Sequence, residues 1–222
     1  MSSAVILGNV STIAGSSQGY AEGVGANAQL ASPIAVVSDG QGNVYFSDLA
    51  NHKIRKVVAA TRQTSLVAGS SQGYAEGVGA AAQFNQPTGL ALDGAGNLYV
   101  AEALGHRIRK IVLATGQTSL VAGSVGGYQE GVGPAAQFAL PAGVAIDGLG
   151  SLYVVENSNN RVRRINLATG LTSLVAGSGG AGAADGSGIA ASFNGPELAY
   201  FDTATNTLFV ADRGNVRIRA VK

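Results

Sequence analysis

Short apolar runs alternate with glycine-rich turns along the whole chain, and the second stretch of this pattern is the clearest. It predicts four strands at Thr88–Asp93, Leu98–Glu102, His106–Val112 and Ser119–Gly123. The string GAGN separates the first two strands and LATGQT the last two, and both are typical turn sequences. A long Gly/Ala-rich segment then leads to the next unit. Four short strands with tight turns and one longer return predict a propeller blade.

The pattern repeats every 54 residues. The strings TIAG, LVAG, LVAG and LVAG end at Gly15, Gly69, Gly123 and Gly177. Repeats of this length mark stacked units that bury their apolar faces against one another. We therefore predict one all-β propeller domain over residues 1–222, made of four-stranded antiparallel blades. Its repeats lie at about 16–69, 70–123, 124–177 and 178–222.

The two ends of the chain are complementary in this pattern. The fourth unit stops at RIRAVK, before a strand of the LVAG type, and the chain begins with such a strand in VSTIAG. We predict that Ser11–Gly15 completes the last blade, which would remove an open sheet edge. Three arrangements remain open: a four-bladed ring within one chain, a fragment of a longer parent, or blades pooled between chains in a homo-oligomer.

Composition narrows the function classes only in part. The chain is 46% hydrophobic and only 12% charged, which is typical of extensive burial. A net charge of +1 gives no bulk attraction to nucleic acid or to acidic membranes, and no apolar stretch is long enough to span a bilayer. The lack of cysteine excludes disulfides and thiolate chemistry. The first ten residues do not form a secretory signal, and the compartment stays unknown.

Four stretches on the predicted third strands resemble one another: NHKIRKV from Asn51, GHRIRKI from Gly105, NNRVRRI from Asn159 and NVRIRAV from Asn215. Together with the pattern P-x-G-x-A-x-D-G-x-G-N-x-Y-V-A-[DE] at Pro87–Glu102, they resemble the NHL-repeat β-propellers of bacterial type. The resemblance implies radial blades whose first strands line a central channel. It is compatible with a secreted bacterial parent. NHL propellers usually close with six blades, whereas this chain supplies four.

The blade geometry implied by the resemblance gathers two sets of carboxylates on the face that carries the long loops. One set ends the second strands and the other lies in the loops: Asp48, Glu102, Glu156 and Asp212, then Glu22, Glu76, Glu130 and Asp185. Such a ring of carboxylates could hold a divalent metal such as calcium. The alternative is structural, with each carboxylate accepting hydrogen bonds in its own turn or pairing with an arginine of the third strand. No cofactor is required by the sequence.

The two histidines, His52 and His106, occupy equivalent places in the first two units. Neutral imidazole is a common metal ligand and general base, so they are candidate catalytic residues beside the second-strand carboxylates. Their alternative role is structural, since histidine is the usual residue of the family at this place.

The long loops also carry the exposed aromatic candidates Tyr20, Tyr74 and Tyr128. RNA-binding surfaces combine basic and aromatic residues on one accessible face. Here the loop-bearing face is acidic and aromatic residues make up only 6% of the chain, so we expect no nucleic-acid partner.

These observations predict a non-catalytic binding or scaffold propeller. Its loop-bearing face would take a protein, peptide or small ligand, with candidate ligand-binding residues Glu22, Glu76, Glu130, Asp185, Tyr20, Tyr74 and Tyr128. The first alternative is a metal-dependent hydrolase of lactones or phosphoesters, with its site at the channel mouth. Its candidate residues are Asp48, Glu102, Glu156, Asp212, His52 and His106. The second alternative is an excised or engineered array that assembles with itself.

Overall fold

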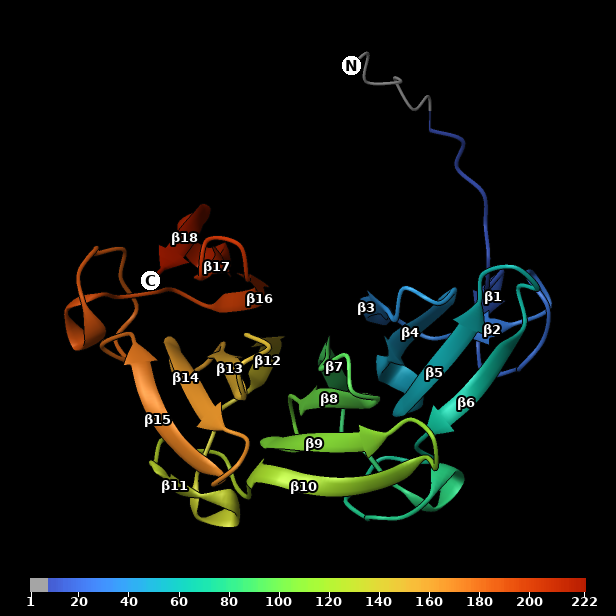
Figure 1. Ribbon diagram of the computed structural model, residues 1–222, viewed down its shortest axis with the longest axis horizontal. Helices are drawn as coiled ribbons and strands as arrows, with labels where there is room; N and C mark the ends of the chain where they lie inside the picture. Colours follow the sequence, from blue (N-terminus) through green and yellow to red (C-terminus); the bar gives the residue numbers. More distant parts are fainter. Residues whose placement is uncertain (1–7) are drawn as a thin grey trace.

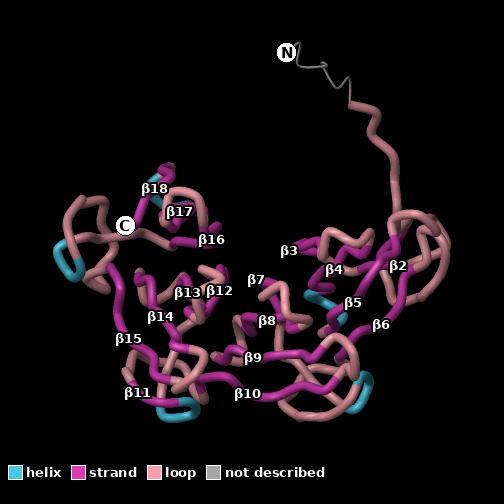
Figure 2. The backbone as a smooth tube through the Cα atoms, in the orientation of Figure 1, coloured by secondary structure: helices cyan, strands magenta, loops and turns pink. Residues whose placement is uncertain are grey.

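The computed structural model describes residues 8–222 and shows four small antiparallel sheets side by side along an open arc (Figure 1). The described part contains no α-helix, and no helix in it is long and apolar enough to cross a membrane. Its helical segments, cyan in Figure 2, are the single 3-10 turns η1 (Leu49–Asn51), η2 (Gly79–Ala81), η3 (Gly133–Ala135), η4 (Gly188–Ala190) and η5 (Arg213–Asn215). The predicted all-β propeller arrangement is confirmed.

Each repeat contributes one blade, with its strands ordered from the inside of the arc to the outside. Blade 1 contains β3 (Pro33–Ser38), β4 (Asn43–Asp48), β5 (Lys53–Val58) and β6 (Thr64–Ala68). Blade 2 contains β7 (Pro87–Leu92), β8 (Asn97–Glu102), β9 (Arg107–Val112) and β10 (Gln117–Gly123). Blade 3 contains β12 (Pro141–Ile146), β13 (Ser151–Glu156), β14 (Arg161–Asn166) and β15 (Leu171–Ala176). Blade 4 has three strands, β16 (Pro196–Asp202), β17 (Thr207–Asp212) and β18 (Arg217–Val221).

The long loops connect the outside of the arc to the inside, and on the way they cover the outer strands. In blade 1 the loop contains β1 (Ser17–Gln18) and β2 (Gln29–Leu30). Val24 in this loop bridges Gln63, next to β6. The equivalent loop of blade 3 contributes β11 (Gly131–Val132), which pairs with β15. In blades 1 to 3 the long loop therefore adds a short fifth edge to the blade that follows it in the sequence.

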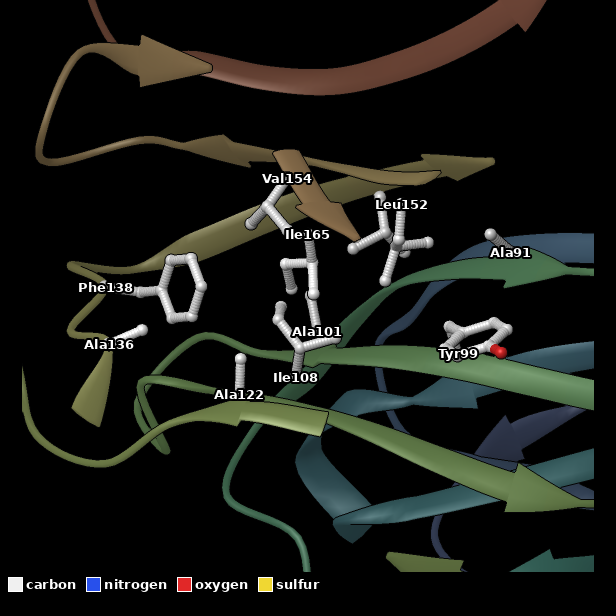
Figure 3. Close-up of a cluster of buried hydrophobic side chains, with 11 residues drawn as sticks. Ala91, Tyr99, Ala101, Ile108, Ala122, Ala136, Phe138, Leu152, Val154 and Ile165 are labelled. Carbon is white, nitrogen blue, oxygen red and sulfur yellow. The ribbon is translucent and has the colours of Figure 1, made fainter. Parts of the chain in front are cut away.

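The core is divided into clusters that lie between neighbouring blades. Figure 3 shows the cluster in which Tyr99 and Ile108 of blade 2 lie beside Leu152 and Ile165 of blade 3. Phe138, fully buried in the same cluster, comes from the long loop. Each such side chain stabilises the fold by about 1.5–3 kcal/mol through its burial. Because these residues are buried by the adjacent blade, we expect a single blade to be unstable by itself.

The predicted closure of the last blade by Ser11–Gly15 is not present in the structure. Blade 4 remains three-stranded, and Ala14 forms a bridge with Gly25 in the loop that leads to blade 1. Figure 1 shows this N-terminal segment leaving the arc at the end opposite to β18. The prediction was wrong because the four blades form an open arc, which keeps Ser11–Gly15 away from β18.

Candidate functional site

A buried arginine on the third strand joins the two carboxylate sets that the sequence singled out. In blade 2, Arg109 donates from Nη1 to Glu102 Oε1 at 2.7 Å and from Nη2 to Glu76 Oε2 at 2.7 Å. The side chains of Arg109 and Glu102 have no exposed surface, and that of Glu76 is 32% exposed. The guanidinium also donates to the backbone carbonyls of Ala75 and Gln83. One arginine thus fastens the loop to the blade.

The same acid–arginine–acid group recurs in every blade, with N···O distances between 2.7 and 3.3 Å. We call these four groups the arginine triads. Each consists of a loop acid, a third-strand arginine and a second-strand acid: Glu22–Arg55–Asp48, Glu76–Arg109–Glu102, Glu130–Arg163–Glu156 and Asp185–Arg219–Asp212. The second-strand acids are all fully buried, whereas the exposed fraction of the loop acids runs from 30% to 92%.

The second oxygen of the buried acids is also occupied. Asp48 Oδ1 accepts the backbone N–H of Ala31 at 2.6 Å, and Glu102 Oε2 accepts that of Asn85 at 2.8 Å. A calcium ion needs about six to eight oxygen ligands, and an acid that already accepts amide and guanidinium protons has few lone pairs left. Within residues 8–222 no three His, Asp or Glu side chains form a group that could hold a metal. The donor set at the second-strand acids therefore does not fit a metal ion.

Burial also shapes the titration of these acids. Loss of hydration raises the pKa of the Glu156 carboxyl to about 7, against the opposing effects of Arg163 and Asn159. Burial raises the pKa of Glu102 in the same way, and Arg109 opposes it. In Glu102 and Glu156 the paired arginine is thus the strongest of the effects that favour the charged carboxylate.

An exposed tyrosine accompanies the triad in each of the first three blades. Tyr20, Tyr74 and Tyr128 are 42–45% exposed and directly precede the loop residue whose carbonyl accepts from the triad arginine. Their rings lie 3.8–4.3 Å from the charged groups of Lys53, Arg107 and Arg161. Cation–π contacts of this kind hold the rings in place. In blade 4 an alanine, Ala183, stands in the place of the tyrosine.

The two histidines connect neighbouring blades. His52 Nδ1 accepts the backbone N–H of Gln86 at 3.2 Å, and His106 Nδ1 accepts that of Leu140 at 3.4 Å. Asn160 makes the equivalent contact in blade 3 with its side-chain oxygen. Burial lowers the pKa of both histidines, and the adjacent Lys53 and Arg107 lower it further. The structure gives each histidine a link to the next blade.

This arrangement predicts how stability changes with pH. A histidine whose folded pKa lies below its unfolded value of 6.5 is protonated first in the unfolded chain, so the free energy of unfolding falls as pH drops below about 6.5. We expect the double variant His52→Asn/His106→Asn to keep the interblade hydrogen bonds, as Asn160 does, and to lose less stability between pH 7.5 and pH 5. Urea unfolding at the two pH values measures this. An equal loss in both proteins would contradict the prediction.

The sequence patterns considered above did not predict one surface, the apolar groove on the concave side of the arc. The inner strands of the four blades form an apolar groove of about 500 Å³ on the concave side, lined by residues that include Val36, Leu90, Val144 and Tyr200. Val36 is 66% and Tyr200 is 67% exposed. The signal was available, because apolar residues occupy successive positions of the first strands and a strand shows only one of its faces to a neighbour.

Comparison with known protein families identifies a repeat in the sequence of blade 3. Residues 138–165, from Phe138 through β12 and β13 to Ile165 in β14, match the NHL repeat. The chain contains an NHL repeat. The triad arginine Arg163 and the interblade residue Asn160 both lie within this match.

Two relatives align with nearly half of this NHL propeller. Protein SUPPRESSOR OF QUENCHING 1, chloroplastic, from Arabidopsis thaliana is 36% identical over 99 residues, which are 44% of this chain and 9% of that protein. NHL repeat-containing protein 2 from Homo sapiens is 34% identical over 112 residues, which are 46% of this chain and 15% of that protein. The NHL propeller therefore corresponds to a small part of the length of these relatives.

Solved structures share the fold. An auxiliary nutrient binding protein from Bacteroides ovatus superposes with a TM-score of 0.70 at 18% identity, over 89% of this chain and 49% of that chain. The matched chain is about twice as long as the NHL propeller described here. At this identity the similarity shows the arrangement of blades alone.

Proposed function

We propose that this NHL propeller is a non-catalytic binding scaffold that takes an extended peptide or protein segment on its loop-bearing face. One observation carries the proposal: three half-exposed tyrosines, Tyr20, Tyr74 and Tyr128, recur at equivalent places on successive blades. An extended segment that follows the arc would meet the same aromatic contact once in every blade. Tyrosine and arginine are among the residues that most often dominate binding energy at protein interfaces.

The arginine triads support this proposal by holding the loops in place before a partner arrives. In blade 1, Arg55 donates to the carbonyl of Ala21 at 2.6 Å and to Glu22 at 2.9 Å, directly after Tyr20 in the sequence. A surface that is already ordered loses little conformational entropy on binding, so more of the contact energy appears as affinity. The loop acids Glu22, Glu76, Glu130 and Asp185 stay partly exposed and could contact basic groups of the partner.

The hydrolase alternative gains no support from this arrangement. The buried acids Asp48, Glu102, Glu156 and Asp212 pair with arginines inside separate blades. A neutral imidazole has one unprotonated nitrogen, and in His52 and His106 this is Nδ1, which already accepts a backbone N–H. A general base must have a free lone pair within reach of the proton that it removes.

The test is a selection of peptides from a displayed random library on the wild-type protein, followed by affinity measurements with the selected peptides. We expect the triple variant Tyr20→Ser/Tyr74→Ser/Tyr128→Ser to weaken binding at least tenfold, about 1.4 kcal/mol. The matched control is Tyr200→Ser, which removes an exposed tyrosine from the concave groove. Binding that survives the triple change, or that is lost in the control, would overturn the proposal.

A further inference from the structure

The outer edge of β18 pairs with no strand in the described part of the chain, although blades 1 to 3 each have a fourth strand there. A groove of about 700 Å³ follows this edge. One wall is β18, and the other is the long loop at Asp185–Gly188, with Phe193 also lining the groove. In this groove the edge of blade 4 remains open.

In the other blades a strand fills this space. In blade 2, β10 lies between β9 and the long loop, where Gln117 bridges Val78. The Thr118 hydroxyl accepts the N–H of Gly77 at 2.9 Å and donates to its carbonyl at 3.1 Å. In blade 3, β15 is enclosed in the same way by β14 and β11. The groove in blade 4 therefore has the shape of a place for a fourth strand.

Side chains beside the groove agree that no strand of residues 8–222 covers this edge. Ile218 on β18 is 73% exposed, whereas the equivalent Ile54, Ile108 and Val162 are fully buried. In blade 1, Ile54 stands opposite Ala68, the alanine of the LVAG string. A strand ending in Ala-Gly would thus cover Ile218 and remove its apolar surface from water.

Such a strand exists at the other end of the chain. Ser11–Gly15 reads STIAG, against SLVAG at 65–69, 119–123 and 173–177. Gly15 has a φ of 93° and donates its N–H to Gly25 at 3.1 Å, as Gly69 with a φ of 109° donates to Gly79 at 3.0 Å. Within residues 8–222, however, no third strand lies beside this segment, and Val10 is fully exposed. The segment thus has the sequence and the glycine geometry that end a fourth strand, but no described third strand of its own chain lies beside it.

We propose that Val10–Gly15 of a second copy docks antiparallel on β18 as the fourth strand of blade 4, so that chains join head to tail. The register of the other blades places Ala14 opposite Ile218 and Ser11 opposite Ala220. Within one chain the two surfaces lie at opposite ends of the arc (Figure 1). A second copy could bring its own N-terminal segment to this edge. This contact joins two different surfaces, so it builds a ring where the rotation closes and a filament where it does not.

At one position the proposed docking strand differs from the fourth strands of blades 1 to 3. Val10 stands where Thr64, Thr118 and Thr172 begin the fourth strands. Valine cannot make the two hydrogen bonds that Thr118 makes with Gly77. Val10→Thr should therefore strengthen the assembly, and Ala14→Lys, which puts a charge against Ile218, should abolish it.

Because the chain lacks cysteine, introduced cysteines report on this contact alone. Ser11→Cys in one copy and Ala220→Cys in an isotopically labelled copy should give a mixed disulfide of twice 22.1 kDa on mild oxidation. The matched control is Thr12→Cys with Ala220→Cys, since residue 12 points to the other face of the strand. Sedimentation of the cysteine-free chain should show masses in multiples of 22.1 kDa that grow with concentration.

Three results would overturn the proposal. The first is a monomer at every concentration, and the second is cross-linking in the control as strong as in the matched pair. The third is an intramolecular disulfide at monomer mass in the double variant Ser11→Cys/Ala220→Cys, which would show that the segment closes its own chain. Strengthening by Val10→Thr and loss by Ala14→Lys, with unchanged circular dichroism, would support it.

Discussion

Arg109→Met should lower the free energy of unfolding by about 3–5 kcal/mol, because it leaves the buried Glu102 without its partner. The same arginine also donates to Glu76 and to two loop carbonyls, so the long loop loses its attachment as well. Urea unfolding followed by tyrosine fluorescence measures the loss, since the chain has seven tyrosines and no tryptophan.

Two further variants separate the charge from the packing. Arg107→Met, two residues away on β9, removes a partly exposed guanidinium and should cost less than about 1 kcal/mol. Adding Glu102→Gln to Arg109→Met should restore part of the lost stability, because a neutral amide replaces the unpaired charge. A loss from Arg109→Met no larger than that from Arg107→Met would contradict the role of the triad.

Gly123→Ala should produce the second large effect. Gly123 ends an LVAG string with a φ of 97°, and a methyl group there would collide with the carbonyl oxygen of His106 and come within 2.9 Å of the Phe138 ring. The strained backbone costs about 1–3 kcal/mol and the forced displacement about as much again. Thermal unfolding followed by circular dichroism measures the sum.

The control for this variant is Gly94→Ala in the turn between β7 and β8. Gly94 also has a positive φ, 71°, but nothing lies within 4 Å of the methyl group that alanine would add. The control therefore reports the backbone strain alone and should be clearly more stable than Gly123→Ala. Equal losses would mean that the close approach to His106 has no energetic effect.

The sequence predicted the blades well because local patterns determine them. In the second unit the predicted strands at 88–93, 98–102, 106–112 and 119–123 correspond to β7, β8, β9 and β10 within two residues at each boundary. The sequence also offered the pairing of second-strand acids with third-strand arginines as one alternative, since both recur at a fixed spacing. Short-range alternation and turn residues carry this information.

The sequence could not predict which third strand each segment of the fourth-strand type lies beside. Ser11–Gly15 has the local pattern of Ser119–Gly123, yet only the second segment lies beside a third strand of its own chain. That outcome depends on the curvature of the whole arc, which is set by packing between blades. At Gly89, for example, a methyl group would come within 2.6 Å of the Ala142 carbonyl oxygen, so the inner strands approach very closely. Such distances are properties of the assembled blades.

The contacts between blades have one direction, and this has a consequence for how such proteins change in evolution. His52 meets the residue before Pro87, His106 meets the residue before Pro141, and Asn160 meets the residue before Pro196. A 54-residue unit duplicated in tandem would thus find an acceptor on the preceding blade and a donor on the following one. Duplication or deletion of one unit can therefore lengthen or shorten such an array by one blade without a new kind of interface.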